Sequence, residues 1–144
     1  MTDVVHRPAG TGPMTWAMGS LFEHVLTGAE SAGALGLALV THPPGTATPL
    51  HRHTHEAEGF SLLDGTMTYR AGEEDFHRPV RFLGMSAPGG LLRLYDDVGV
   101  PAAERRLPGE DGQSTDVEIP RWNEVAPGYG LEVLGPPLPQ EADR

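Results

Sequence analysis

Hydrophobic and polar positions alternate along this chain in short runs, and glycine- or proline-rich turns separate the runs. Alternation of this kind predicts strands, because a strand points successive side chains to opposite faces. The run 34–41, ALGLALVT, is apolar at both sets of positions, so it is expected to be buried on both sides or to cross the wall of a barrel. The stretches that predict strands are 16–26, 34–41, 48–55, 59–63, 66–70 and 80–86, with another strand beginning at 75–77.

Two stretches carry the marks of helices. Residues 91–98 predict a helix that ends at Gly99, and Asp116 is expected to cap a short helix over 117–125 with Pro120 in its first turn. Asp96 and Asp97 are then expected on a solvated face of the first helix. No repeat or second domain is visible, so residues 1–144 are predicted to form a single domain. Its less regular parts are an arm over 1–13, expected to pair with a neighbouring subunit, a linker-like segment over 101–115 and a polar tail over 136–144.

Composition supports the strand-rich interpretation and excludes several function classes. The chain of 144 residues carries 19 glycines and 14 prolines, which suits short strands joined by tight turns. It has no cysteine, so disulfides and thiolate metal sites are excluded. A net charge of −10 would repel a phosphate backbone, and we expect no nucleic-acid partner. No apolar run approaches the ~18 residues of a membrane span, and the N-terminus lacks the apolar core of a signal peptide, so the cytoplasm is expected.

Candidate chemistry is concentrated between Gly45 and Gly65, in the stretch GTATPLHRHTHEAEGFSLLDG. His51 and His53 alternate along the predicted strand, so both imidazoles are expected to project from one face. Glu58 follows after a short turn and can return to the same point. Two imidazoles and a carboxylate that converge are a ligand set for a divalent metal. Glu58 is also the candidate catalytic residue, as the proton acceptor of such a site.

This stretch resembles the first signature motif of the cupin family, because the spacing of Gly45, His51, His53, Glu58 and Gly65 matches residue for residue. The segments FLGMSAPGGLLRLYDDVG and YGLEVLGPPLP are similar to the closing parts of single-domain cupin-2 proteins of the quercetin dioxygenase-like type. The resemblance implies an all-β fold, the cupin double-stranded β-helix or jelly-roll barrel, with short C-terminal helices. It also implies a metal held by three histidines and a glutamate, with Fe(II) favoured and Mn, Ni or Zn as alternatives.

The second cupin motif, which supplies a strand pair and a further histidine ligand, is missing here, since DFH runs directly into RPVRFLG. A barrel shortened by this strand pair would close smaller or leave an open edge. Three outcomes stay open for the metal. The site could use three ligands and open water positions, His77 or His55 could replace the lost histidine, or the site could be vestigial. His77 is the favoured substitute, because it lies near the point where the chain would rejoin the sheet.

Three functions are compatible with these residues. The first is a metal-dependent enzyme acting on a small organic molecule within the barrel, for which the resemblance implies dioxygenase, isomerase or cyclase chemistry. The second is a non-catalytic binding or sensing module with a degenerate metal site, and the third is a structural β-domain that acts through dimerisation. A homodimer is expected, because an incomplete barrel exposes edges. The remaining histidines His6, His24 and His42 are expected to be structural, and Trp16, Phe60, Met67 and Tyr69 to pack in the core or line a pocket.

Overall fold

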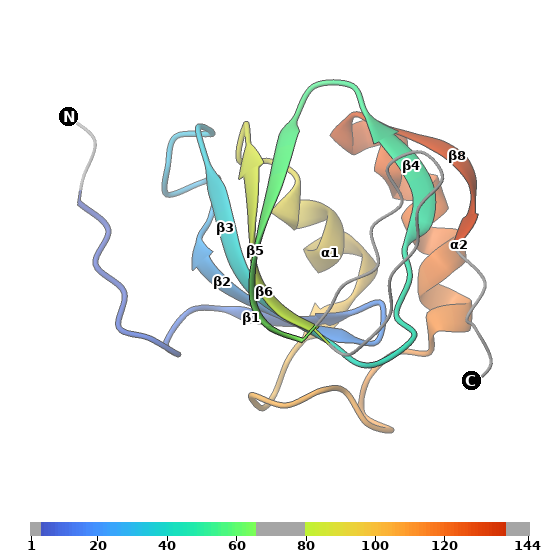
Figure 1. Ribbon diagram of the computed structural model, residues 1–144, viewed down its shortest axis with the longest axis horizontal. Coiled ribbons are helices and arrows are strands. Elements are labelled where there is room, and N and C mark those ends of the chain that lie inside the picture. The colour runs from blue at the N-terminus through green and yellow to red at the C-terminus, as the bar shows by residue number, and fades with distance from the viewer. Residues whose placement is uncertain (1–3, 66–79, 138–144) are drawn as a thin grey trace.

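The computed structural model of the chain describes residues 4–65 and 80–137. A curved, six-stranded antiparallel sheet in the order β5-β6-β3-β2-β1-β7 forms one wall, and a two-stranded sheet, β4-β8, lies opposite it (Figure 1). The prediction of a mainly β domain is therefore confirmed. The strands are β1 (Met14–Ala17), β2 (Ser20–Leu26), β3 (Gly36–His42), β4 (Pro49–His53), β5 (Ala57–Gly65), β6 (Val80–Ala87), β7 (Val100–Pro101) and β8 (Leu131–Pro137).

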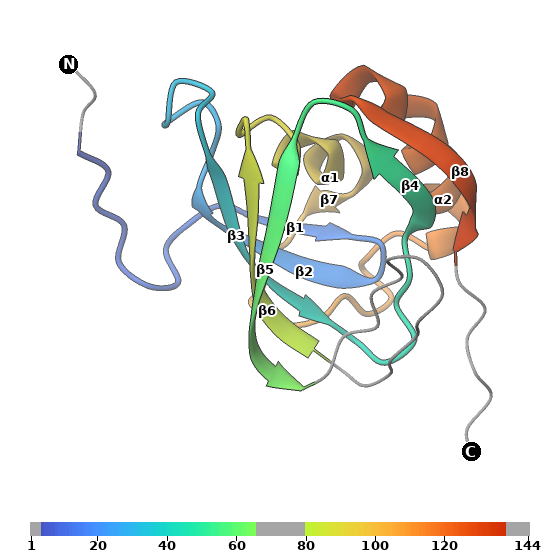
Figure 2. The ribbon, with the colours of Figure 1, turned by 45° about the horizontal axis from the view of Figure 1, so that its top comes forward.

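Two helices cover different parts of this arrangement, one between the two sheets and the other beside the small sheet. Helix α1 (Leu92–Val98) lies between the two sheets, and α2 (Thr115–Val125) packs beside β8, followed by the 3-10 turn η1 (Ala126–Tyr129) (Figure 2). Leu92 packs with the inner face of the large sheet, whereas Leu94 packs in a second cluster with Trp122 and Leu131. Helix α1 therefore joins two hydrophobic cores and fixes the distance between the walls.

Most predicted elements are confirmed, with small shifts at their ends. The runs 34–41, 48–55 and 80–86 form β3, β4 and β6, and the run 91–98 forms α1. The backbone N–H of Gly99 donates to the carbonyl of Tyr95 at the end of that helix. The predicted strand 59–63 is the middle of a longer strand, β5, which begins at Ala57. Glu58 therefore lies on a strand rather than in the turn before it.

The predicted single strand over 16–26 is wrong, because the chain reverses within it. Ala17 pairs with Ser20, and the two residues between them have positive φ, 53° at Met18 and 70° at Gly19. Two left-handed residues in a two-residue loop make the tight turn that suits the twist of a β-hairpin. Glycine adopts this conformation without strain, but methionine at the first position gave no sequence signal for a turn.

The second helix also begins earlier than predicted. Its N-cap is Ser114, whose side chain accepts a hydrogen bond from the N–H of Asp116, so Asp116 is not the cap. Pro120 consequently lies in the second turn, where it removes one helical hydrogen bond. The linker-like segment 101–115 overlaps β7 at one end and α2 at the other. Between them it is tied to the sheet, since the Trp16 indole N–H donates to the carbonyl of Arg106 at 2.9 Å.

The N-terminal arm packs against its own chain from Arg7 onward. The Arg7 guanidinium donates to the carbonyl of Val25 at 2.9 Å and forms an ion pair with Glu30 at 2.5 Å. This part of the arm therefore contacts strand β2 of its own chain, and the expected pairing with a neighbouring subunit stays a prediction. The predictions for 66–70 and 75–77, for Met67, Tyr69 and His77, and for 138–144 lie outside the described residues.

Among the helices of the described ranges, none has the length and apolar character needed to cross a bilayer.

Candidate metal centre

Strand β4 places His51 and His53 on the face that looks toward the large sheet. The strand pairs with β8, with His51 opposite Val133 and His53 opposite Leu131, which is 3% exposed. Arg52 lies between the two histidines and points to the other face, where it forms an exposed ion pair with the Glu132 carboxylate. The alternation predicted from the sequence is confirmed, because polar contact falls on one face and burial on the other.

Strand β5 brings Glu58 toward the same space from the opposite wall. Glu58 pairs with Ser86 across the sheet, and Phe60 pairs with Gly84 two residues further on. Paired residues of neighbouring strands share a face, and Ser86 is 2% exposed. Glu58 therefore points into the interior between the sheets. The chain needs only residues 54–56 to pass from the histidine strand to the glutamate strand.

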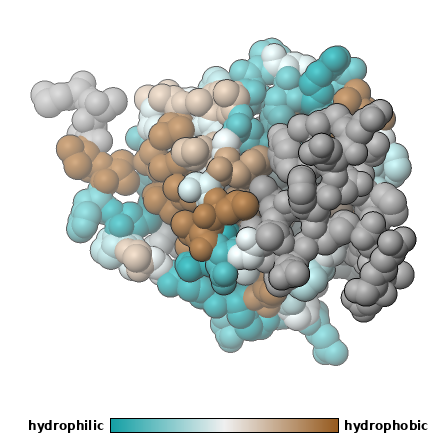
Figure 3. Space-filling model, viewed as in Figure 1, coloured by the Kyte–Doolittle hydropathy of each residue, from teal (hydrophilic) through white to brown (hydrophobic). Residues whose placement is uncertain are grey.

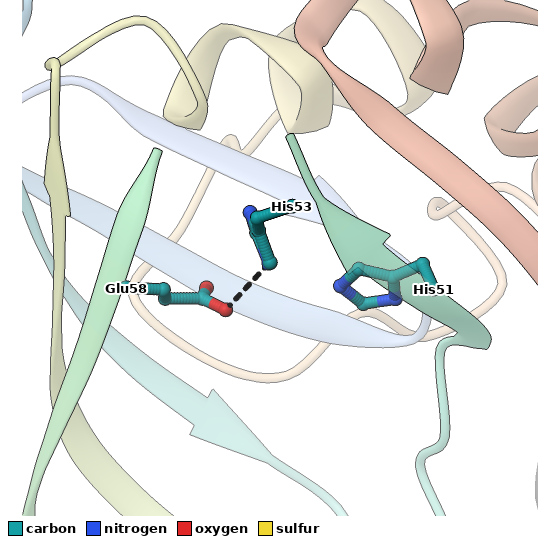
Figure 4. Close-up of side chains that lie close together, drawn as sticks. All are labelled: His51, His53 and Glu58. Carbon is teal, nitrogen blue, oxygen red and sulfur yellow. Dashed lines mark ion pairs between the residues drawn. The ribbon is translucent and has the colours of Figure 1, made fainter. Parts of the chain in front are cut away.

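The three side chains converge on one point (Figure 4). His51, His53 and Glu58 each offer a ligand atom, and these atoms all lie within 4.8 Å of one another. The Nε2 atom of His53 lies 3.1 Å from Oε2 of Glu58, and the centroids of the two imidazole rings are 5.0 Å apart. The predicted convergence of these three residues is therefore confirmed as geometry.

Two contacts hold the His51 ring in place. Its Nδ1 lies 2.7 Å from the carbonyl oxygen of Pro49, which can only accept, so Nδ1 carries the proton and donates. In the neutral ring this leaves the lone pair on Nε2. The indole of Trp122, which is fully buried, packs against the imidazole at 5.1 Å between centroids and 57° between planes. Backbone and α2 together therefore present Nε2 of His51 as a ligand atom.

His53 is held less firmly by its surroundings. Within the described ranges, both of its ring nitrogens are buried and have no hydrogen-bond partner of good geometry, although Nε2 is close to the Glu58 carboxylate. That carboxylate raises the pKa of His53, and partial burial opposes the shift. When His53 is protonated, its positive charge neutralises the Glu58 carboxylate at the point where a cation would otherwise bind, so the proton and the cation compete.

The other candidate ligand in the described part of the chain, His55, does not join this group. His55 is exposed, and its Nδ1 lies 2.6 Å from the hydroxyl of Thr54, as expected for a residue past the end of the strand. His42 is structural as predicted: burial between Phe22 and Phe82 lowers its pKa to about 4, so its ring is neutral. His77 lies outside the described residues.

Asp96 and Asp97 are exposed, as predicted for a solvated face of α1, but each also makes a side-chain contact that the sequence did not predict. Asp96 Oδ1 lies 3.0 Å from Nε2 of His24 and accepts a hydrogen bond from the Thr15 hydroxyl at 2.5 Å. Asp97 accepts a hydrogen bond from the hydroxyl of Tyr129. Both contacts join residues far apart in the sequence, so no local sequence pattern could predict them. They tie α1 to the sheet and to η1.

The sequence also gave no signal for the two residues that orient His51. The Pro49 carbonyl is a backbone group, and Trp122 lies 71 positions after His51 on a helix whose packing no motif specifies. Comparison with known proteins adds no further residues: no protein-family model matches the chain, and no curated protein matches it. The resemblance to cupins therefore depends on the motif residues and on the geometry described above.

Proposed function

We propose that His51, His53 and Glu58 bind one divalent metal ion, and that the chain is a cupin-like, metal-dependent enzyme acting on a small organic molecule between its two sheets. One observation carries the proposal: three ligand atoms from two facing strands lie within 4.8 Å of one another. Two facing antiparallel sheets, with the ligands between them, also agree with a shortened jelly-roll barrel as the finer description of the fold.

The donor set fits a divalent ion. Two imidazoles and one carboxylate are the facial triad that holds Fe(II) in oxygenases, and the same ligands also suit Mn, Ni and Zn. His51 is oriented as a ligand before any ion binds, whereas both nitrogens of His53 have no good hydrogen-bond partner in the described ranges. An ion would satisfy one of those two nitrogens, because an imidazole binds a given metal ion through a single ring nitrogen. Three protein ligands leave coordination positions open, and His77 stays the candidate for a fourth.

The residues around the triad fit an apolar organic substrate. Phe22, Phe60 and Phe82 lie on the inner face of the large sheet, and Tyr95 of α1 stacks on Phe22 at 4.2 Å between centroids. Such a wall excludes water and packs against the carbon skeleton of a small molecule. A bound metal would supply Lewis-acid or redox chemistry, in a dioxygenase, isomerase or cyclase reaction. Glu58 is the candidate proton acceptor, because its carboxylate is the acidic member of the triad and faces the interior between the two sheets.

One observation favours a second function, a binding or sensing module without turnover. His53 and Glu58 already neutralise each other as an ion pair, so the cluster can persist without a cation. In that case the chain would bind a small molecule without a metal, and the histidine–glutamate pair would be a structural remnant. A thermal-shift screen separates the two: a ligand that stabilises the protein equally with and without chelator indicates binding without a metal.

The test of the proposed metal site is metal analysis of protein purified without an affinity tag. We expect about one divalent ion per chain in the wild type and none in the double variant His51→Ala/His53→Ala. The matched control is His55→Ala, which removes a neighbouring exposed histidine and should keep the ion. Equal trace metal in the wild type and the double variant would overturn the proposal.

A further inference from the structure

Helix α2 carries two polar side chains that lie inside the molecule rather than at its surface. Figure 3 shows hydrophilic side chains over the loop between β4 and β5, at the top of Figure 1. By contrast, Glu118 is 1% exposed and Trp122 is fully buried. Oε2 of Glu118 and Nε1 of Trp122 are both buried, and neither has a hydrogen-bond partner among the described residues. Buried polar atoms are almost always paired, so these two atoms point to a shared partner.

The two side chains lie on the same face of α2. Glu118 and Trp122 are four positions apart, which places their Cβ atoms about 5–6 Å from each other. A helical side chain extends toward the N-terminal end of its helix, so the indole is directed toward the turn that carries Glu118. An indole N–H only donates a hydrogen bond, and a carboxylate oxygen accepts one. The two unpaired atoms are therefore chemically complementary.

The hairpin between β1 and β2 holds the Glu118 carboxylate beside the core that contains the indole. The backbone N–H groups of Met18 and Gly19, at the tip of the hairpin, face this carboxylate and oppose the rise in its pKa that burial causes. Met18 packs in the same hydrophobic core as Trp122. A Cβ atom added to Gly19 would lie 3.7 Å from the methyl group of Thr115, so the hairpin tip contacts the first turn of α2.

Other buried polar groups in the described ranges are less suitable partners for the indole. The Ser20 hydroxyl, at the hairpin, already lies 2.5 Å from Nδ1 of His42. Glu56 also has a buried oxygen without a partner, but this atom would lie 3.1 Å from a Cβ atom on Gly130, beyond the C-terminal end of α2. Glu118 is therefore the best acceptor for the indole N–H in the described part of the chain.

We propose that one buried water molecule bridges Oε2 of Glu118 and the Nε1–H of Trp122, and that this bridge holds the indole against His51. A water molecule can accept from the indole and donate to the carboxylate, and buried waters make about three such bonds. The indole packs against the imidazole of His51 at 5.1 Å between ring centroids. Glu118 is thus a positioning residue for His51, and its consequence for metal binding rests on the proposed function.

Nuclear magnetic resonance of the indole N–H groups tests the bridge, because the chain has only two tryptophans. In the ¹⁵N-labelled wild type, we expect the Trp122 N–H to show a cross-peak to bound water. Trp16 is the internal control, since its N–H donates to the carbonyl of Arg106 at 2.9 Å and should show no such cross-peak. The signal lost in Trp122→Phe assigns the pair. A wild-type Trp122 N–H without a water cross-peak would overturn the proposal, whether or not any variant folds.

Substitutions of Glu118 separate a bridge from simple packing. Glu118→Met keeps the length of the side chain but removes the acceptor, so the water cross-peak should be lost and the Trp122 N–H signal should move upfield. Glu118→Gln keeps polar atoms at both positions and should retain the cross-peak. The matched control is Glu56→Met, which removes the other unpaired carboxylate oxygen and should leave the Trp122 signal unchanged. A cross-peak that persists in Glu118→Met, or that is lost in Glu56→Met, would overturn the proposal.

The positioning of His51 has a readout that needs no metal. The ring current of Trp122 shifts the imidazole protons of His51, so their chemical shifts should change in Glu118→Met and stay at wild-type values in Glu118→Gln. Unchanged His51 shifts in Glu118→Met would overturn the positioning role. Affinity for Mn²⁺ should fall about threefold in Glu118→Met, less than for loss of a direct outer partner. A wild type that binds no Mn²⁺ would contradict the proposed function alone, because the water cross-peak and the imidazole shifts are measured without metal.

Discussion

In the described part of the chain, two clusters pair a largely buried histidine with a carboxylate, and they differ in what surrounds the pair. Near β4, Nε2 of His53 lies 3.1 Å from Glu58. Beside α1, Nε2 of His24 lies 3.0 Å from Asp96. The distances are almost the same, but the first pair faces a second imidazole across the interior, and the second pair faces a threonine hydroxyl.

The difference separates a candidate site from a structural tie. Thr15 and His24 both contact Oδ1 of Asp96, so this carboxylate holds α1 on the sheet through two polar contacts. In the other cluster, no comparable hydroxyl within the described ranges closes the pair, and His51 offers a further ligand atom. A histidine–carboxylate pair is thus not a metal site by itself. A third ligand atom, from His51, lies within 4.8 Å of the ligand atoms of His53 and Glu58, and this atom distinguishes the candidate metal site from the structural pair.

The largest expected effect is on metal affinity. His53→Ala should weaken binding of a divalent ion by more than about 100-fold, which is the upper end of what loss of an outer partner costs. His24→Ala removes a histidine of the same kind from the other cluster and should leave affinity unchanged within about threefold, because His24 contacts Asp96 rather than the triad. Titration against a fluorescent chelator measures both. An equal loss of metal affinity in the two variants would show that the two clusters do not differ in metal binding.

A third carboxylate, Glu118, sharpens the comparison because it is fully buried and, among the described residues, has no imidazole partner. It is 1% exposed, and burial raises its pKa to about 7 although backbone N–H groups of Met18 and Gly19 stabilise the charge. A folded pKa above the unfolded value means that stability falls as pH rises from about 4.5 to about 7.

Glu118→Gln should remove this pH dependence, because the amide does not ionise. Relative to the wild type, we expect the variant to gain about 1–3 kcal/mol of unfolding free energy between pH 4.5 and pH 8. Urea unfolding at the two pH values measures the change, and the difference between variant and wild type cancels contributions from other groups. A wild type and variant with parallel pH profiles would show that Glu118 titrates normally.

Asp96 should behave in the opposite sense. Burial opposes its ionisation, but hydrogen bonds with His24 and Thr15 outweigh burial and lower its pKa below 3.8. A lowered pKa stabilises the fold above the unfolded value, and this contribution is lost as pH falls through the folded pKa. Asp96→Ala should lower the unfolding free energy at pH 7 by less than about 1 kcal/mol, because the carboxylate is 45% exposed and solvent screens its charge, and the difference from the wild type should narrow below pH 3.8. A difference that stays constant into acid would contradict the assigned role of the charge.

The smallest effect is expected at Trp122, which orients His51 without reaching the ion. Trp122→Leu removes the aromatic contact and should weaken metal affinity about tenfold while the stoichiometry stays the same. Trp122→Phe keeps a ring against the imidazole and should lie within about threefold of the wild type. Affinity and stoichiometry from the same chelator titration separate the two. Equal affinities in both variants would show that the indole only packs.

Local patterns predicted the parts of the fold that depend on period and on turn chemistry. Strand alternation located β4 and set both histidines on one face, and helical spacing with Gly99 located α1. The hairpin at Met18–Gly19 was missed because methionine rarely occupies a left-handed position, so no residue type marked the reversal. The start of α2 was misplaced because Ser114 and Asp116 are both good caps, and only the backbone decides between them.

The same limit applies to the candidate site. Motif spacing brought together His51, His53 and Glu58, because they lie within eight positions on two successive strands. It could not supply Trp122 or the link from His24 to Asp96, whose partners are 71 and 72 positions apart. Contacts at such separations depend on how the sheets and helices pack, which period and composition do not determine.

The most direct test of the metal centre is anomalous X-ray diffraction from crystals of the wild type soaked in Mn²⁺. We predict one strong peak between β4 and β5, about 2.0–2.3 Å from Nε2 of His51, from a ring nitrogen of His53 and from a carboxylate oxygen of Glu58. The same map shows whether His77 provides a fourth ligand. No peak at that point, or a peak only at the pair of His24 and Asp96, would contradict the account.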